Sequence, residues 1–339
     1  MTAEPQATPR QVAAPEVGVV VIGRNEGERL LRCLASLPAG APVAYVDSGS
    51  TDGSPERAAR SGAAVVVLDA ATPFTAARGR NAGLEKLRAA HPQLEFAQLI
   101  DGDCLLSSSW ISAALAAIRS DPQLAIVCGR RREQQPDASV YNRLCDMEWD
   151  GEVGETRECG GDALVRIAAL AAVGGFRASM IAGEEPELCF RLRAAGWKIR
   201  RIAAEMTLHD AAIHRFGQWW TRQVRAGYAY ALCWALHGDS AERFRERQLR
   251  SILIWGAGVP AAALLLAGVY APLGLATLAL YAVLYRRVRA ARLRRDPDAR
   301  HARLDAAFCV LGKFAQLSGL TRFAADRLRG RREQLIEYK

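Results

Sequence analysis

Four short apolar runs, separated by stretches with helical periodicity, constrain the fold of this 339-residue chain more than any other feature. The runs lie at residues 17–23, 43–46, 64–68 and 96–100, and leucines recur at helical spacing after the first run, at Leu30, Leu31, Leu34 and Leu37. Strands that alternate with helices form a parallel sheet that is covered on both faces. The sequence therefore predicts an α/β fold, with a mostly parallel, Rossmann-like sheet flanked by helices.

The alternation continues less regularly in the next hundred residues. We expect helices at residues 110–119, 167–173 and 184–195, and strands at residues 125–129 and near residues 199–202. Residues 130–158 are polar and carry several charges, so we expect them to be irregular.

Polar residues follow three of the four predicted strands. Arg24, Asn25 and Glu26 follow the first strand, Asp47 follows the second, and Asp101-Gly102-Asp103 follows the fourth. Right-handed crossovers bring the carboxyl ends of parallel strands to one edge of the sheet, and ligands bind in the crevice outside that edge. We therefore expect these residues to share one binding crevice.

Asp101 and Asp103 have the chemistry of a divalent-cation site. Mg²⁺ and Mn²⁺ prefer carboxylate ligands, and such a cation can neutralise the phosphates of a bound ligand. Gly102, between the two aspartates, allows a close approach of the backbone to the ligand. Mg²⁺ or Mn²⁺ is the cofactor that this motif predicts.

A second group of carboxylates lies at the start of a predicted helix. Glu184, Glu185 and Glu187 bracket Pro186, which stands in a first-turn position. Acidic residues there complement the helix dipole, which accounts for one or two of them. Three within four residues indicate a further role, and a general base for an acceptor hydroxyl is the role that a transfer reaction needs.

Taken in order, these motifs resemble those of family 2 glycosyltransferases, which have the GT-A fold. The resemblance covers about residues 17–215 and rests on the segments at residues 19–26, 47–53, 77–83, 101–103, 160–162, 174–176 and 184–191. It implies a nucleotide-diphosphate sugar as donor and inversion by direct displacement at the sugar.

The resemblance also implies a role for each matching residue. Glu185 takes the place of the catalytic base, and the metal ligands would be Asp101, Asp103 and His209. Asp47 would hydrogen-bond the nucleobase, Asp101 would hold ribose or metal, and Arg80 would contact the diphosphate. The implied donor site comprises Gly23, Arg24, Asn25, Glu26, Asp47, Ser48, Gly49, Arg80, Asp101 and Gly102, and the implied acceptor side comprises Gly160, Gly161, Asp162 and Glu184. The sequence departs from the family pattern in having Arg24 where an aromatic residue is common, and glutamate rather than aspartate at position 185.

The regions outside residues 17–215 predict an attachment to a membrane. Residues 1–16 read as a disordered lead-in without the features of a secretory signal peptide. Residues 216–250 read as an amphipathic helical linker, residues 251–285 as an apolar helical hairpin, and residues 286–339 as a basic amphipathic region. Arginines on both sides of the hairpin account for much of the net charge of +9, in a pattern typical of membrane flanks rather than a nucleic-acid groove. The hairpin could span the bilayer, enter it partly, or be a buried soluble hairpin.

The leading hypothesis is an inverting, metal-dependent glycosyltransferase at the cytoplasmic face of the inner or plasma membrane. Its acceptor would be a cell-envelope or lipid-linked saccharide. The alternatives are a sugar-phosphate nucleotidyltransferase and a non-catalytic, membrane-anchored nucleotide-sugar-binding protein. The eight cysteines contain no Cys-x-x-Cys pair, so their spacing predicts ordinary reduced thiols rather than a metal site.

Overall fold

The structure, a computed structural model, describes residues 16–330 and residue 336. Apart from Glu16, the predicted lead-in at residues 1–16 lies outside the described residues. The last part of the predicted basic region, at residues 331–335 and 337–339, lies outside them as well.

The first hundred residues fold as the apolar runs predict, with each expected strand and helix present. These elements are β1 (Val17–Gly23), α1 (Glu28–Ala35), β2 (Val43–Asp47), α2 (Ser54–Arg60), β3 (Ala64–Val67), α3 (Ala76–Ala90) and β4 (Phe96–Asp101). The middle of β1 is fully buried at Val19, Val20 and Val21, as a strand covered on both faces requires. Each such valine stabilises the fold by about 1.5–3 kcal/mol through burial.

The next hundred residues contain more regular structure than expected. They form β5 (Cys104–Leu106), α4 (Trp110–Arg119), β6 (Leu124–Glu133), η1 (Pro136–Ala138), α5 (Val140–Glu148), β7 (Gly154–Glu155), β8 (Ala163–Arg166), α6 (Ile167–Ala172), α7 (Glu184–Ala194) and β9 (Lys198–His209). The expectation that residues 130–158 are irregular is wrong, because β6 runs on to Glu133 and α5 follows. The hydrophobic pattern did not predict helix α5, because its buried face consists of Asn142, Cys145 and Met147 rather than a row of aliphatic residues.

The strands form one mixed sheet in the order β3-β2-β1-β4-β8-β6-β9-β5, with β7 paired to β9. Strands β3, β2, β1 and β4 are parallel, and β6 is parallel to β9, whereas β8 is antiparallel to both of its neighbours. In the register of the central strands, Gly23 pairs with Asp47, and Ile22 pairs with Asp101. The predicted site residues therefore lie at one edge of adjacent strands.

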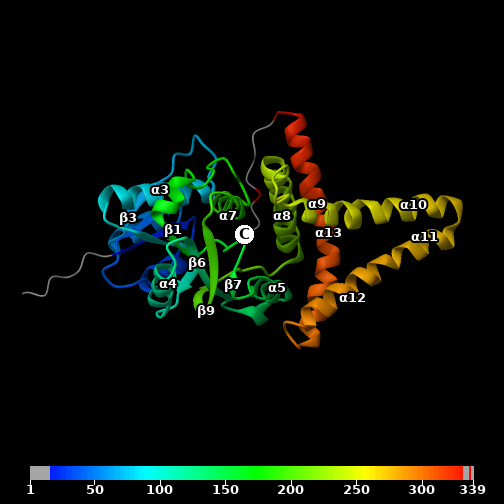
Figure 1. The fold of residues 1–339 in the computed structure, drawn as a ribbon, viewed down its shortest axis with the longest axis horizontal. Helices are drawn as coiled ribbons and strands as arrows, with labels where there is room; N and C mark the ends of the chain where they lie inside the picture. Colours follow the sequence, from blue (N-terminus) through cyan, green and yellow to red (C-terminus); the bar gives the residue numbers. More distant parts are fainter. Residues whose placement is uncertain (1–15, 331–335, 337–339) are drawn as a thin grey trace, which may run out of the picture.

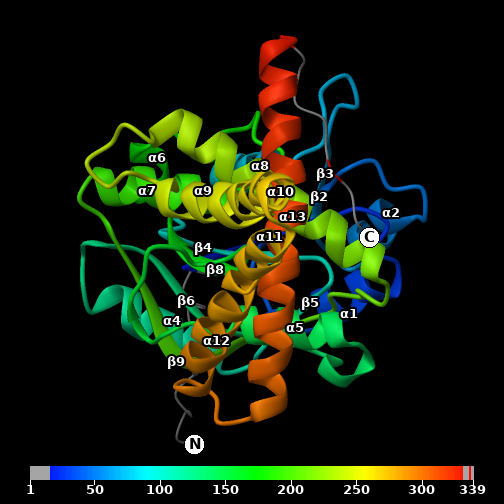
Figure 2. The same ribbon diagram turned by 90° about the vertical axis from the view of Figure 1, so that its right-hand side faces the viewer.

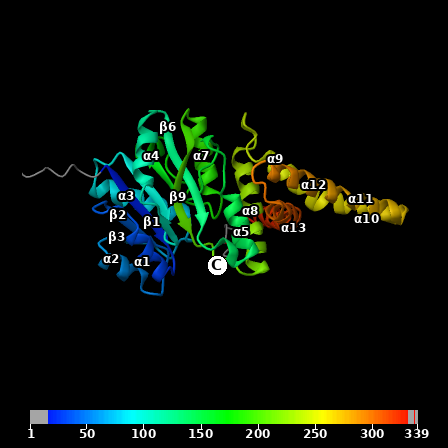
Figure 3. The same ribbon diagram turned by 90° about the horizontal axis from the view of Figure 1, so that it is seen from below.

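The last third of the chain is helical and contains the predicted hairpin. Its elements are α8 (Phe216–His237), α9 (Glu246–Ile252), the π-helical η2 (Leu253–Gly258), α10 (Val259–Val269), α11 (Ala271–Leu278), α12 (Leu280–Leu293) and α13 (Ala299–Leu328). Figures 1 and 3 show α10, α11 and α12 projecting away from the sheet, and Figure 2 looks along this projection. Helices α8 and α13 cross where Gly227 meets the Gln316 carbonyl, since a Cβ at Gly227 would lie 2.0 Å from that oxygen. This close crossing attaches the hairpin to the rest of the molecule.

Candidate active site

The Asp101-Gly102-Asp103 motif forms the turn from β4 to β5 at the edge of the sheet. The Gly102 amide donates a hydrogen bond to the Ile22 carbonyl at 2.8 Å. A Cβ on Gly102 would lie 3.2 Å from both that carbonyl oxygen and Glu26 Cγ. The glycine is therefore needed for close packing of the turn against the end of β1.

Asp101 lies between two arginines. Its Oδ1 is 2.9 Å from Nη2 of Arg80, and its Oδ2 is 3.2 Å from Nη2 of Arg131. Burial raises the pKa of Asp101, but the charges of Arg80 and Arg131 more than offset this and hold the pKa below its ordinary value. Asp101 is thus an ionised carboxylate whose two oxygens are both engaged by guanidinium groups.

Arg131, on β6, is a site residue that the sequence interpretation missed. Besides Asp101, it approaches Asp162 with Nε at 3.5 Å, and its guanidinium lies over the Trp149 ring at 4.9 Å from the centroid. In the sequence it is one of three successive arginines and looks like part of a solvated charge run. The alternation of side chains along a strand could have indicated Arg131, because successive residues point to opposite faces of a sheet. In β6 the side chain of Arg131 is 12% exposed, whereas that of Arg132 is 48% exposed.

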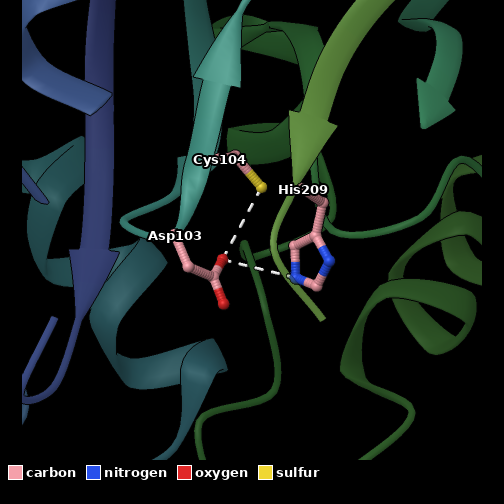
Figure 4. A group of neighbouring side chains, drawn as sticks. All are labelled: Asp103, Cys104 and His209. Atoms are coloured by element: carbon pink, nitrogen blue, oxygen red, sulfur yellow. Dashed lines mark hydrogen bonds and ion pairs between the residues drawn. The ribbon is translucent and has the colours of Figure 1, made fainter. Parts of the chain in front are cut away.

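Asp103 faces His209, which is the last residue of β9. Asp103 Oδ1 lies 3.3 Å from His209 Nε2 and 3.7 Å from Cys104 Sγ, as Figure 4 shows. All three side chains are buried, and the His209 ring packs edge-on against Trp149 at 4.7 Å between ring centroids. The pairing of β5 with β9 places Cys104 opposite His209 and so brings the group together.

The loop after β2 is organised around Asp47. The Asp47 carboxylate is 1% exposed and accepts hydrogen bonds from the Gly49 amide at 2.9 Å, the Ser50 amide at 2.8 Å and the Tyr45 hydroxyl at 2.9 Å. The Ser48 amide donates to the Gly23 carbonyl at 3.0 Å. Asp47 therefore shapes this loop and ties it, through Ser48, to the end of β1.

The segment after β1 packs against the same loop. Asn25 has a positive φ of 55°, and its side chain accepts a hydrogen bond from the Thr51 amide at 2.8 Å. Glu26 forms an ion pair with Arg29 at 2.8 Å. The Arg24 guanidinium lies 5.8 Å from the centroid of the Phe74 ring. Phe74, from the loop before α3, thus supplies an aromatic ring next to the position where the sequence has arginine.

The Gly160-Gly161-Asp162 segment supports the clamp around Asp101. A Cβ on Gly161 would lie 2.9 Å from Arg80 Nη2 and 3.1 Å from Asp101 Oδ2, so glycine leaves room for that ion pair. Asp162 is fully buried, and it accepts a hydrogen bond from the Asp101 amide at 3.1 Å and from the Thr207 hydroxyl at 2.8 Å. Asp162 therefore holds the end of β4 against β9.

The three glutamates at the start of α7 point to three different partners. Glu184 Oε1 lies 2.8 Å from Arg80 Nη1, which links α7 to Asp101 through one guanidinium. Glu185 is 8% exposed, and its Oε1 accepts a hydrogen bond from the Cys159 amide at 2.6 Å. Glu187 is fully buried against Arg191 and His237. The carboxylate cluster is therefore more than helix capping.

The surroundings of two of these carboxyls shift their pKa values in opposite directions. Burial, and then the charge of Glu158, raises the pKa of Glu185. Burial also acts to raise the pKa of Glu187, but hydrogen bonds from Arg191 and His237 hold it below its ordinary value. Glu185 thus binds a proton more readily than an ordinary glutamate does, whereas Glu187 is held ionised within an ion-pair group.

Comparison with known proteins identifies the class of this site. The model of glycosyl transferase family 2 matches residues 18–173. A solved structure of the mannosyltransferase PcManGT from Pyrobaculum calidifontis, in complex with GDP-Man and Mn²⁺, aligns with a TM-score of 0.59 at 18% identity, over 96% of this chain and 91% of that chain. No curated protein sequence matches this chain.

Two further solved structures are similar over most of their length. Residues 1–349 of S. aureus TarS align with a TM-score of 0.49 at 13% identity, over 94% of this chain and 92% of that one. Glucosyl-3-phosphoglycerate synthase from Mycobacterium tuberculosis aligns with a TM-score of 0.46 at 17% identity, over 67% of this chain and 82% of that one.

The family model and the PcManGT alignment confirm the predicted GT-A fold. They favour neither the nucleotidyltransferase nor the non-catalytic alternative. Residues 18–173 therefore form a glycosyltransferase family 2 domain, and the chain has the GT-A fold expected for it.

Proposed function

We propose that this glycosyltransferase is inverting and metal-dependent, and that it transfers a sugar to a hydroxyl of a cell-envelope or lipid-linked saccharide. One observation carries the proposal: Arg80 bridges Asp101 of the β4 turn and Glu184 of α7, at 2.9 and 2.8 Å. This bridge brings the predicted donor side and the predicted acceptor side into one group of side chains. Direct displacement requires both substrates within such a group.

The residues around Asp103 fit a small divalent cation such as Mg²⁺ or Mn²⁺. Ligand atoms on adjacent corners of an octahedron with bonds of about 2.1 Å lie about 3.0 Å apart. The Asp103 Oδ1 to His209 Nε2 distance of 3.3 Å is close to this value. A cation held by Asp103 and His209 would neutralise charge on the donor diphosphate.

Asp101 has a different role in this proposal. A cation bound directly to it would lie beside two guanidinium groups and be repelled by both. Asp101 instead orients Arg80 and Arg131, whose remaining N–H groups can donate charge-assisted hydrogen bonds to the phosphates. Arg24 and Phe74 offer planar surfaces for the nucleobase next to the Asp47 loop.

Glu185 is the proposed general base. Its raised pKa brings it closer to the pH at which a base works best, and Glu184 is already paired with Arg80. The carboxylate of Glu185 would accept the proton of the acceptor hydroxyl as that hydroxyl attacks the anomeric carbon from the side opposite the leaving diphosphate.

The test is a donor screen with purified protein. UDP-, GDP- and dTDP-sugars are incubated with Mn²⁺, with and without lipid-linked acceptors, and release of the nucleoside diphosphate is measured. GDP-mannose is the first donor to try, because PcManGT was solved with GDP-Man and Mn²⁺. Release that requires Mn²⁺ and an acceptor supports the proposal, and the product anomer then decides between inversion and retention. No release from any donor would reject it.

We further propose that the apolar hairpin attaches the enzyme to the cytoplasmic face of the inner or plasma membrane. The helix from Glu246 to Val269 has 24 residues, about 36 Å at 1.5 Å per residue, against a hydrocarbon core of about 30 Å. Large apolar side chains near its turn are exposed, with Leu264 at 76%, Leu265 at 74% and Val269 at 85%. Full recovery of the protein in the soluble fraction, without detergent, would contradict this attachment.

A further inference from the structure

The proposed base and two buried thiols next to it form a group, and the transfer reaction does not use the chemistry of the thiols. Cys159 precedes the glycines of the 160–161 segment, while Glu185 and Cys189 stand four residues apart on α7 and therefore share one face of that helix. Both thiol sulfurs lie 3.0 Å from Glu185 Oε1. Cys159 is 6% exposed, Glu185 is 8% exposed and Cys189 is fully buried.

The spacing of the two sulfurs fits a shared metal ion. They lie 3.9 Å apart, which is far beyond the length of a disulfide, about 2.05 Å. Two thiolates bound to one tetrahedral zinc at about 2.3 Å each would be about 3.8 Å apart. The observed distance between the sulfurs therefore matches two corners of a zinc tetrahedron. Glu185 Oε1 lies 3.0 Å from each sulfur and would move outward by about 0.5 Å to take a third corner, which leaves the fourth for water.

The donor set selects a different metal from the one proposed at Asp103. Thiolates favour Zn²⁺ and its heavier analogue Cd²⁺, whereas carboxylate and water ligands suit Mg²⁺ and Mn²⁺. The group at Asp103 offers an oxygen, a nitrogen and the Cys104 sulfur, whereas Cys159, Cys189 and Glu185 offer two sulfurs and an oxygen. The second group is richer in sulfur, so it favours Zn²⁺ over Mg²⁺ and Mn²⁺ more strongly than the first group does.

We propose that Cys159, Glu185 and Cys189 form a site for Zn²⁺ whose occupation inhibits the enzyme. Binding would release the two thiol protons to solvent and place the carboxylate of Glu185 on the metal. The metal site itself does not depend on the proposed function. The inhibition rests on it, because a carboxylate bound to zinc cannot accept a proton from an acceptor.

The first experiment measures metal binding without any sugar transfer. Cd²⁺ alone is titrated into the reduced, metal-free protein, and the ultraviolet charge-transfer band of cadmium thiolate is followed. We expect one high-affinity equivalent in the wild type, and an affinity at least about tenfold lower in Cys159→Ser and Cys189→Ser, since even loss of an outer-shell partner costs about 10- to 100-fold. Cys309→Ser, which changes a partly exposed thiol on α13, is the matched control and should bind like the wild type.

A third variant guards against misfolding of the cysteine variants. Glu185→Gln retains both thiols and should keep the thiolate band while binding Cd²⁺ more weakly. The site is rejected if the wild type shows no band, or if Cys159→Ser and Cys189→Ser bind Cd²⁺ as tightly as Cys309→Ser does.

The second experiment tests the inhibition. In the Mn²⁺-dependent assay, Zn²⁺ should inhibit the wild type and Cys309→Ser. Inhibition of equal strength in Cys189→Ser would overturn the inhibitory role but not the metal site. A protein that binds Cd²⁺ in this way but transfers no sugar would refute the proposed function alone.

Discussion

Arg80 provides a sharp test of the site, because it neutralises two carboxylates at once. Its guanidinium is 3% exposed and lies within 2.9 Å of both Asp101 and Glu184. In Arg80→Met the side chain keeps its bulk but loses its charge. Removing one partner of a buried ion pair costs about 3–5 kcal/mol. Asp101 keeps Arg131, so we expect the lower end, about 3 kcal/mol.

Thermal unfolding at neutral pH measures this loss. A chain of this size loses about 2 °C in Tm per kcal/mol, so Arg80→Met should unfold about 6 °C below the wild type. Arg88→Met removes one positive charge from an exposed position on the same helix and should change Tm by less than about 1 °C.

The pH dependence of this loss distinguishes electrostatics from packing. The folded pKa of Asp101 is below its ordinary value of 3.8, so its ion pairs stabilise the protein above about pH 4 and are lost as the pH falls through the lowered pKa. The Tm difference between wild type and Arg80→Met should therefore be largest at neutral pH and shrink below pH 4. If the difference did not shrink at any pH below 4 at which the wild type still folds, Arg80 would act by packing, and the electrostatic reasoning would be refuted.

Further variants test the metal, the base and the glycine. Asp103→Ala should abolish Mn²⁺-dependent binding of the donor nucleotide in calorimetry, and unchanged binding would place the metal elsewhere. Glu185→Gln should retain donor binding but lose about 10²- to 10⁴-fold in transfer rate, and normal turnover by this variant would exclude Glu185 as the base. Glu184→Gln should instead weaken donor binding. Because the folded pKa of Glu185 is raised above 4.5, wild-type activity should fall with acid from a pH above that value. Gly161→Ala should reduce donor affinity by displacing Arg80, and a wild-type dissociation constant would contradict the close contact.

The sequence predicted the sheet and the polar residues at its edge well because those features have local causes. Strand β1 is buried on both faces and reads as an unbroken apolar run, and polar residues follow it directly. Strand β5 has three residues, which is too short for any periodicity to indicate. Helix α5 was missed because its buried face includes an asparagine and a cysteine.

The sequence could not predict contacts between distant segments. Cys159 and Cys189 are thirty residues apart and match no ligand spacing, yet their sulfurs lie 3.9 Å apart. The bend that brings them together depends on the turn before α7, where Gly183 has a φ of 77°. The sequence shows Arg131 only as one of three successive arginines, and the pairing of strands in the sheet brings it beside Asp101.

The two aspartates of the motif have separate environments, and this separation limits how the site can work. Asp101 is held by Arg80 and Arg131, so its charge is balanced within the protein. Asp103 lies beside His209, an imidazole that can bind a cation as well as hydrogen-bond a carboxylate. A ligand that brought phosphates to this edge would therefore meet fixed positive charge on one side and a cation-binding pair on the other. Since Arg80 also holds Glu184, displacing its guanidinium toward a phosphate would loosen the start of α7. Donor binding and the position of the proposed base are thus coupled through one side chain, and an Arg80 variant should alter donor affinity and transfer rate together.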